Sequence, residues 1–216
     1  MSRQSRRIVD LSLDIYPGAP SFPGDPACQF NIHDTIASVG YNLTQICFGS
    51  HQGTHLDAPY HFYGPGKTVD QVDLERCVGP ATVVDFSWKQ PKESITVADF
   101  APYEPIVQQG ARILLRLGWD KMLGQPGYFT DFPSMTTELA NWLASRKIAL
   151  IGMDSPGPSA DQWKDVHLAL LAAEVVIVEG LANLEQLPTG EVFFIAAPLR
   201  LQGLDGSPVR ALALLD

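Results

Sequence analysis

The stretch Gly49-Ser50-His51-Gln52-Gly53-Thr54-His55-Leu56-Asp57-Ala58-Pro59-Tyr60-His61-Phe62 decides how this chain folds around its chemistry. It holds three of the five histidines of the chain, with an aspartate between the second and the third. Neutral imidazole nitrogen and carboxylate oxygen are the usual protein ligands of zinc, and they also suit manganese and iron. The stretch therefore predicts a metal site.

The same residues indicate a loop or a bulged strand instead of a helix. His51 and His55 are four positions apart and would share one face of a helix. However, Gly49, Gly53 and Pro59 interrupt the run, and in a helix interior glycine costs about 1 kcal/mol and proline about 3 kcal/mol. Glycine would also let the backbone pass close to a bound ion.

The spacing alone leaves two roles open for His61. It could be a third ligand, or it could stay free as an acid and base, because histidine titrates near neutral pH. Both readings remain open at this point.

The composition is that of one ordinary globular domain over residues 1–216. The chain is 45% hydrophobic and 18% charged, which is below the usual quarter, and its net charge is −9. An acidic protein without a basic patch is not expected to bind nucleic acid or an anionic membrane surface. The sequence contains no run of eighteen apolar residues, so we expect no membrane span.

The cysteines indicate a reducing compartment. Cys28, Cys47 and Cys77 are odd in number and widely spaced, which does not predict a disulfide framework or a thiolate zinc site. The N-terminal segment Met1–Arg7 is basic, but Asp10 and Asp14 fall where a signal peptide would be apolar. We expect no signal peptide and a cytoplasmic protein.

Short β-rich runs bounded by Gly, Pro or Asp dominate the chain and predict an α/β domain with a mixed sheet. Several of them are continuously apolar, as in strands that are buried on both faces. The predicted strands are Ile8–Leu13, Asn42–Phe48, Ala81–Phe86, Arg112–Leu117, Ile148–Gly152, Val175–Glu179, Val192–Ala196 and Val209–Leu215.

Helical patterns are fewer. Met135–Arg146 is predicted to be a helix with Ser134 as its N-cap, and Lys164–Ala173 a second helix with Asp161 as a possible cap. A short helix is expected from Thr96 to before Pro102. The Gly- and Pro-rich stretch Gly118–Pro133 is expected to be a long surface loop, a type of segment that is often functional.

Two distant residues could complete the metal site. Glu179 ends an apolar strand, where a carboxylate is costly to bury unless it is paired or bound to metal, although a strand end may simply reach solvent. His167 lies within the second predicted helix and could equally be a histidine bonded to the backbone. Asp154 ends another strand and is read as structural or supporting, and His33 is given no role.

Several blocks resemble the metal-dependent cyclase family, which includes bacterial kynurenine formamidases (arylformamidases) and isatin hydrolases. The most specific is His51-x-Gly-Thr-His55-x-Asp57-x-Pro-x-His61. The blocks follow the family order along nearly the whole chain. They also include Phe22-Pro23-Gly24-Asp25, Arg116-Leu117-Gly118-Trp119, Ile151-Gly152-Met153-Asp154-Ser155-Pro156, His167 through Glu179 and on to Leu184, and Asp205-Gly206-Ser207-Pro208-Val209-Arg210-Ala211.

The resemblance implies a swivelling β/β/α fold, a homodimer, and one or two divalent metal ions, with zinc favoured and manganese possible. By motif position, His51, His55 and Asp57 would hold one metal. His167 would hold a second, with Asp57 and Glu179 shared between the two. His61 would remain unligated as the proton donor and acceptor.

The resemblance also implies hydrolysis of a small aromatic amide or lactam. Phe22, Phe62 and Trp119 are the expected substrate-binding residues. Kynurenine formamidases of the family generally carry tryptophan at the position of Phe22, paired histidines at Val166-His167, and serine at Gly157. Isatin hydrolase is similar to a one-metal version with an amide at the position of Glu179.

The sequence therefore leaves three candidate functions open. The first is cleavage of an N-formyl aryl amine, and the second is ring opening of a cyclic amide or lactone. The third is a metal-binding module without catalysis, against which the presence of His61 argues.

Overall fold

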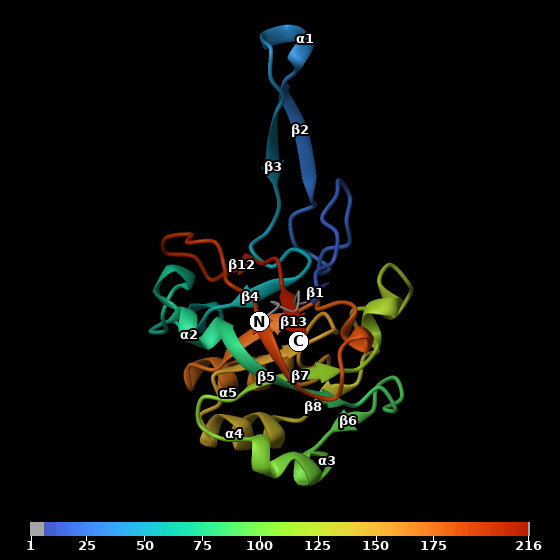
Figure 1. The fold of residues 1–216 in the computed structure, drawn as a ribbon, viewed down its shortest axis with the longest axis vertical. Helices are drawn as coiled ribbons and strands as arrows, with labels where there is room; N and C mark the ends of the chain where they lie inside the picture. The colour runs from blue at the N-terminus through green and yellow to red at the C-terminus, as the bar shows by residue number, and fades with distance from the viewer. Residues whose placement is uncertain (1–6, 216) are drawn as a thin grey trace, which may run out of the picture.

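A computed structural model describes residues 7–215, so most of the basic N-terminal segment lies outside the described residues. The fold is built on a nine-stranded mixed sheet (Figure 1). In sheet order, the strands are β1 (Arg7–Asp10), β13 (Leu212–Leu215), β11 (Gly190–Ile195), β5 (Val78–Asp85), β7 (Arg112–Arg116), β9 (Leu150–Met153), β10 (Val176–Glu179), β4 (His55–Asp57) and β12 (Gly206–Pro208).

The central strands β5, β7, β9 and β10 run parallel and are buried on both faces. In β7, Ile113 and Leu115 face one hydrophobic core and Leu114 faces the other. Val83 and Val84 divide in the same way in β5. Alternate side chains of a strand point to opposite faces, so a continuous apolar run serves both cores. The expected α/β class with a mixed sheet is confirmed.

Two helices cover the face of the sheet that lies towards the bottom of Figure 1, namely α4 (Thr137–Ser145) and α5 (Trp163–Ala172). Below them lies α3 (Val97–Phe100), and a small parallel pair, β6 (Ser94–Ile95) with β8 (Ser134–Met135), lies beside them on the right of Figure 1. The body also contains the short helix α2 (Leu74–Cys77), which precedes β5.

The predicted strands are all present, with ends shifted by a few residues. The strands β2, β4, β6, β8 and β12 were not predicted because each is short or polar. Both main helices are confirmed. However, the cap of α4 is Thr136, whose side chain accepts a hydrogen bond from the Leu139 amide, and Ser134 instead lies in β8. The N-cap of α5 is Gln162, not Asp161.

The segment Gly118–Pro133 is not a surface loop throughout. It begins with a 3-10 turn at Trp119–Met122, and Trp119, Tyr128 and Phe132 are buried in the core on the helical side. The glycines and prolines set its turns, whereas the aromatic side chains between them are what the fold buries.

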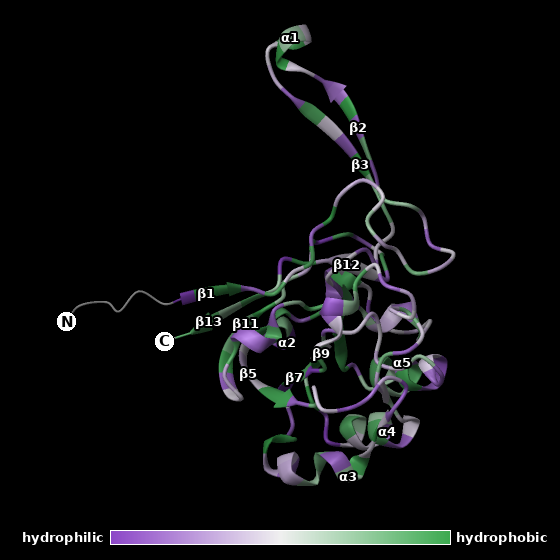
Figure 2. Cartoon of the chain, turned by 90° about the vertical axis from the view of Figure 1, so that its right-hand side faces the viewer, coloured by the Kyte–Doolittle hydropathy of each residue, from purple (hydrophilic) through white to green (hydrophobic). Residues whose placement is uncertain are grey.

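An arm extends from the body (Figures 1 and 2) and consists of β2 (Gln29–Asp34), α1 (Ile36–Val39) and β3 (Leu43–Cys47). Nearly all of its side chains are exposed, Ile32 at 75% and Ile46 at 59% among them. Among the described residues, no helix has both the length and the apolar character needed to span a membrane.

Candidate active site

The register of β4 against β10 places the first acidic and imidazole groups of the site opposite each other. His55 is paired with Glu179 and Ile177 with Asp57, in antiparallel order. Residues directly opposite share a sheet face, as do residues two apart on a strand. His55, Asp57 and Glu179 therefore point to the same side, and all three are nearly or fully buried.

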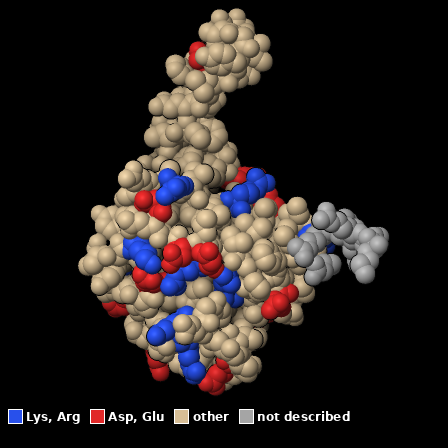
Figure 3. All heavy atoms as spheres, turned by 60° about the vertical axis from the view of Figure 1, so that its left-hand side comes forward, with Lys and Arg blue, Asp and Glu red and all other residues tan. Residues whose placement is uncertain are grey.

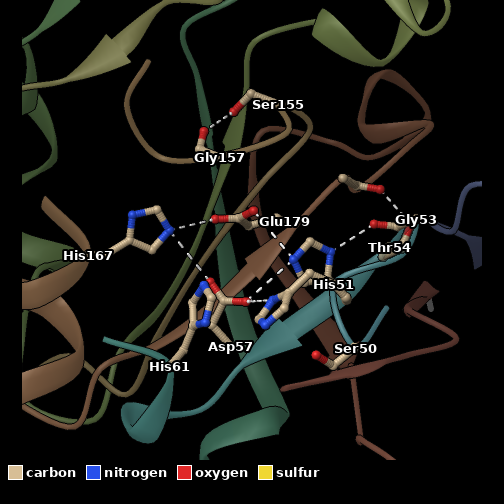
Figure 4. A network of polar contacts seen from close by, with 12 residues as sticks. Ser50, His51, Gly53, Thr54, Asp57, His61, Ser155, Gly157, His167 and Glu179 are labelled. Carbon is tan, nitrogen blue, oxygen red and sulfur yellow. Dashed lines mark hydrogen bonds and ion pairs between the residues drawn. The ribbon is translucent and has the colours of Figure 1, made fainter. Parts of the chain in front are cut away.

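His167 reaches this group from helix α5, which packs beside β10 (Figure 4). Its Nε2 lies 3.1 Å from Oε1 of Glu179 and 3.7 Å from Oδ2 of Asp57. The ring of Phe62 stacks on the imidazole, with centroids 4.4 Å apart. This stacking restricts the ring to the orientation that faces the carboxylates.

Backbone carbonyls fix the tautomers of two of the imidazoles. Nδ1 of His167 donates to the Trp163 carbonyl at 2.6 Å, and Nδ1 of His55 donates to the Gly53 carbonyl at 2.9 Å. In the neutral form that binds metal, each ring would have its unprotonated Nε2 directed at the carboxylates. This is the arrangement in which metal-ligating histidines are usually held.

His51 lies between two carboxylates. Its Nδ1 is 2.8 Å from Oδ1 of Asp57, and its Nε2 is 2.7 Å from Oδ2 of Asp205. Sequence reasoning quoted Asp205 only as part of a motif block and gave it no role in the site. The pairing of β12 with β4, which sets Gly206 opposite Asp57, is what brings Asp205 next to His51.

Gly206 also shows why this loop approaches so closely. A Cβ at position 206 would lie 2.8 Å from Cε1 of His51 and 2.8 Å from the Leu56 carbonyl oxygen. Only a residue without a side chain leaves room for the His51 ring at this point.

His61 lies beside the group without a close hydrogen bond to it. It comes from the 3-10 turn Pro59–His61, its ring stacks on that of His51 at 3.9 Å, and its Nδ1 is 3.6 Å from Oδ2 of Asp205. Ligand atoms of His51, Asp57 and His61 lie within 4.8 Å of one another, as do those of His55, Asp57 and Glu179.

The electrostatics divide the histidines into two kinds. Burial opposes protonation of His51 and His55, but the carboxylates outweigh it, Asp57 with Asp205 for His51 and Asp57 with Glu179 for His55. The resulting pKa is about 9 for His51 and about 10 for His55. For His61, burial dominates and lowers the pKa below its ordinary value.

The same contacts lower the pKa values of the two buried carboxylates. Burial alone would raise the pKa of Asp57, but the neighbouring imidazoles hold that pKa well below its ordinary value. Burial and Asp57 both act to raise the pKa of Glu179, yet hydrogen bonds from His167 and His55 leave it lowered. Both carboxylates are therefore anionic at neutral pH.

One observation tests whether this set suits a divalent metal. Oδ2 of Asp57 is fully buried and has no hydrogen-bond partner among the described residues. A buried anionic oxygen without a donor is costly, and such oxygens are normally paired or bound to metal. The donor set, imidazole nitrogen with carboxylate oxygen, is that of zinc and related ions. The residues fit a divalent metal.

A cavity of about 610 Å³ opens onto this group. That volume is typical of a small-molecule site. Its walls are largely apolar and include six aromatic side chains, Phe22, Phe62, Tyr128, Phe129, Phe132 and Trp163.

Trp119 is a correction to the expected substrate-binding residues. It does not line the cavity but packs in the core, where its indole N–H donates to the Tyr128 carbonyl. Phe22 and Phe62 do line the cavity.

Asp154 and His33 do not belong to the groups of side chains that could hold a metal. Asp154 accepts hydrogen bonds from the backbone amides of Leu117 and Gly118, so it anchors the loop that follows β7. His33 is exposed on the arm.

Comparison with known proteins agrees with this geometry. Residues 9–160 match the model of the Cyclase family. The chain belongs to the Cyclase family. It is 31% identical to the kynurenine formamidase of Sphingopyxis alaskensis, over 95% of this chain and 97% of that protein. It is 32% identical to the kynurenine formamidase of Bacillus cytotoxicus, over 94% and 95%.

A solved structure is similar over almost the same length. Isatin hydrolase A from Labrenzia aggregata, bound to benzyl benzoate, superposes with a TM-score of 0.87 at 28% identity and covers 97% of this chain and 94% of its own. The similar proteins are therefore named as formamidases or as an isatin hydrolase.

Proposed function

We propose that this cyclase-family protein is a metal-dependent hydrolase that cleaves the C–N bond of an N-formyl aryl amine. The observation that carries the proposal is the buried oxygen of Asp57, which has no hydrogen-bond donor among the described residues although it belongs to a group of imidazoles that line the cavity. The kynurenine formamidases and the isatin hydrolase that match the chain over nearly its full length support the same reaction class.

Each site residue has a proposed duty. His51, His55 and Asp57 would hold one divalent metal, His167 would hold a second, and Asp57 and Glu179 would be shared. The short distances from Glu179 to His167 and to His55, 3.1 and 3.4 Å, support a carboxylate placed between two sites. Zinc is the proposed metal and manganese the alternative, since both accept these donors.

When bound, a divalent metal supplies Lewis acidity that polarises a carbonyl oxygen and lowers the pKa of water. The chain supplies the rest. The aromatic walls orient the aryl ring and exclude bulk water. His61, whose lowered pKa leaves it neutral at pH 7, would accept the proton that the attacking water loses and deliver it to the departing nitrogen, so that an anilide anion need not leave.

Ring opening of a cyclic amide is the second candidate. The high structural similarity to isatin hydrolase A favours it. Phe22 on the cavity wall also favours it, because kynurenine formamidases of the family generally carry tryptophan at that position. The same residues would act in the same order, because the nitrogen again leaves as an amine.

Two measurements test the proposal. Elemental analysis of protein purified without added metal should find one or two equivalents of a divalent ion. Assays against N-formylkynurenine and isatin should then show hydrolysis of at least one of them, lost on chelation and regained on adding zinc or manganese. A metal-replete protein inactive on both compounds and on simple formanilides would overturn the proposed reaction.

We also propose a homodimer in which the arm is the contact. A two-stranded hairpin is marginally stable alone, and this one exposes large apolar side chains while Asp34 is its one acidic or basic residue other than histidine (Figure 3). Ile32→Glu should shift the sedimentation coefficient from dimer to monomer. Trp88→Glu, at an exposed tryptophan on the body, is the control.

A cytoplasmic location and a single domain over residues 1–216 complete the proposal. Three free thiols, Cys28, Cys47 and Cys77, support a reducing compartment. One sheet with a core on each face supports a single domain.

A further inference from the structure

Gly157 leaves a gap in the cavity wall beside the proposed metal ligands. Apart from its chain neighbours, a Cβ at this position would have two heavy atoms of the described residues within 4 Å. They are Cζ of Phe132 at 3.6 Å and Oε1 of Glu179 at 3.9 Å, which are ordinary van der Waals distances. Gly157, Phe132 and Glu179 all line the cavity. The space that a small side chain would occupy here is therefore part of the cavity.

The backbone does not require a glycine at position 157. Two other glycines of the cavity wall, Gly53 and Gly180, have positive φ angles of 65° and 62°. A Cβ on Gly180 would also lie 2.8 Å from the Gly53 carbonyl oxygen. Backbone conformation thus explains those two glycines. Gly157 has no positive φ, so its missing side chain matters through the space that it leaves.

Hydrogen bonds on both sides of Gly157 keep the gap open. The hydroxyl of Ser155 donates to the Gly157 carbonyl at 2.7 Å, and the Ser155 carbonyl accepts from the Gly180 amide at 2.9 Å. The Pro158 carbonyl accepts from the Met135 amide at 2.8 Å. The loop is therefore tied to the residue after β10 on one side and to β8 on the other.

The gap lies where the acyl side of a bound amide would be. Oε1 of Glu179, which borders the gap, is 3.1 Å from Nε2 of His167, so the gap is next to the group that would hold the metal. In Figure 4, His61 lies on the opposite side of Glu179 from Gly157. A carbonyl carbon between them, with its nitrogen towards His61, has its remaining substituent towards Gly157.

That substituent differs between classes of amide. In a formamide it is a hydrogen atom, which would not reach the atoms around the gap. In an acetamide it is a methyl group, which would gain contacts with them at ordinary van der Waals distance.

We propose that Gly157 makes this enzyme accept aryl amides whose acyl carbon carries a small carbon substituent, with N-acetyl aryl amines as the substrate class. In this reaction water gives its hydroxyl to the acyl carbon and its hydrogen to the nitrogen as the C–N bond breaks. The products are acetic acid and the aryl amine. This selectivity rests on the proposed function, since it assumes that an aryl amide is hydrolysed at the metal ligands, and it extends that function beyond the formyl group.

The test compares the N-formyl and N-acetyl derivatives of one aryl amine. One pair is built on aniline and a second on the aryl nitrogen of kynurenine, so that each pair releases the same amine and is followed by one assay. We expect the metal-replete wild type to hydrolyse both members of a pair. Hydrolysis of the formyl compounds without turnover of the acetyl compounds would overturn the inference.

The variant Gly157→Ala places a methyl group of the protein in the gap. We expect the ratio of kcat/KM for the formyl compound to that for the acetyl compound to rise roughly 10- to 200-fold, the usual range for one methylene in an apolar pocket. Gly64→Ala is the matched control, because Gly64 is exposed, has no positive φ and is not part of the cavity lining. An unchanged ratio in Gly157→Ala, or an equal loss for both compounds, would remove Gly157 from the role.

Urea unfolding separates this effect from a folding defect. Replacing glycine by alanine where the backbone is compatible should leave Gly157→Ala at least as stable as the wild type. A marked loss of stability would show that the gap is not free space, which would also overturn the inference. Gly157→Ser is a second variant and should change the ratio in the same direction.

The two proposals fail in different ways. If the metal-replete wild type hydrolyses none of the four compounds and does not open isatin, the proposed reaction is wrong. If it hydrolyses the formyl compounds alone, the reaction stands and the acceptance of an acetyl group is wrong.

Discussion

Oδ1 of Asp57 lies 2.8 Å from Nδ1 of His51, while Oδ2 of the same carboxylate is buried without a donor. One oxygen of this carboxylate is therefore already hydrogen-bonded within the protein, and the other has no donor among the described residues. The geometry makes Asp57 the centre of the site.

We expect Asp57→Ala to lose bound metal and stability together. The substitution removes the shared ligand and leaves His51 and His55 without their main counter-charge. Breaking a buried pair on one side typically costs about 3–5 kcal/mol. Elemental analysis and urea unfolding would measure both effects, with Glu138→Ala, an exposed acid on α4, as the control. Full metal occupancy in the Asp57 variant would contradict the shared-ligand role.

His61→Ala separates the two roles that the sequence left open. If His61 only transfers protons, the variant should keep its metal and lose turnover by a factor on the order of 10²–10⁴. The stacked position on His51 and the 3.6 Å distance to Asp205 agree with a ring that is held near the proposed metal ligands without a hydrogen bond to them. Loss of metal from this variant would show instead that His61 is a ligand.

Much of the site could be predicted because its chemistry is local in the sequence. His51, His55, Asp57 and His61 fall within one motif, and the structure brings them together with His167 and Glu179. Asp205 was missed because it has no metal-ligand neighbour in sequence. Only the pairing of β12 with β4 brings it to His51.

The position of Trp119 and the start of α4 differ from the predictions for a similar physical reason. Trp119 is an aromatic residue of the kind that lines cavities, but its ring is buried in the core and its indole N–H donates to the Tyr128 carbonyl. Ser134 is a good N-cap by residue type. It lies in β8 because the pairing of Ile95 with Met135 extends the chain there, which moves the helix start to Thr136.

Thr136→Ala should lower stability by about 1 kcal/mol, the usual cost of losing a side-chain cap. α4 packs through Leu139, Ala140 and Leu143, so its first turn would fray while the rest stays docked. Urea unfolding of this variant and of Thr136→Ser, which keeps the hydroxyl, gives the measurement. A loss of equal size in both variants would mean that the cap hydrogen bond is not the cause.

The buried carboxyl of Asp154 should give the protein a pH-dependent stability. Burial raises the pKa of Asp154 to about 7, even though the amides of Leu117 and Gly118 favour its charged form. In the unfolded chain Asp154 ionises near the ordinary value of 3.8. The folded protein is therefore most stabilised by the protonated Asp154 below that pH, where no penalty for burying a charged carboxylate arises. This stabilisation then falls as the pH rises towards 7 and is constant above, with a slope of up to about 1.4 kcal/mol per pH unit. Asp154→Asn cannot ionise, so urea unfolding between pH 4 and 8 should show a shallower decline for the variant than for the wild type. If both lose stability equally across that range, Asp154 keeps an ordinary pKa in the folded protein, and the backbone amides outweigh the effect of burial.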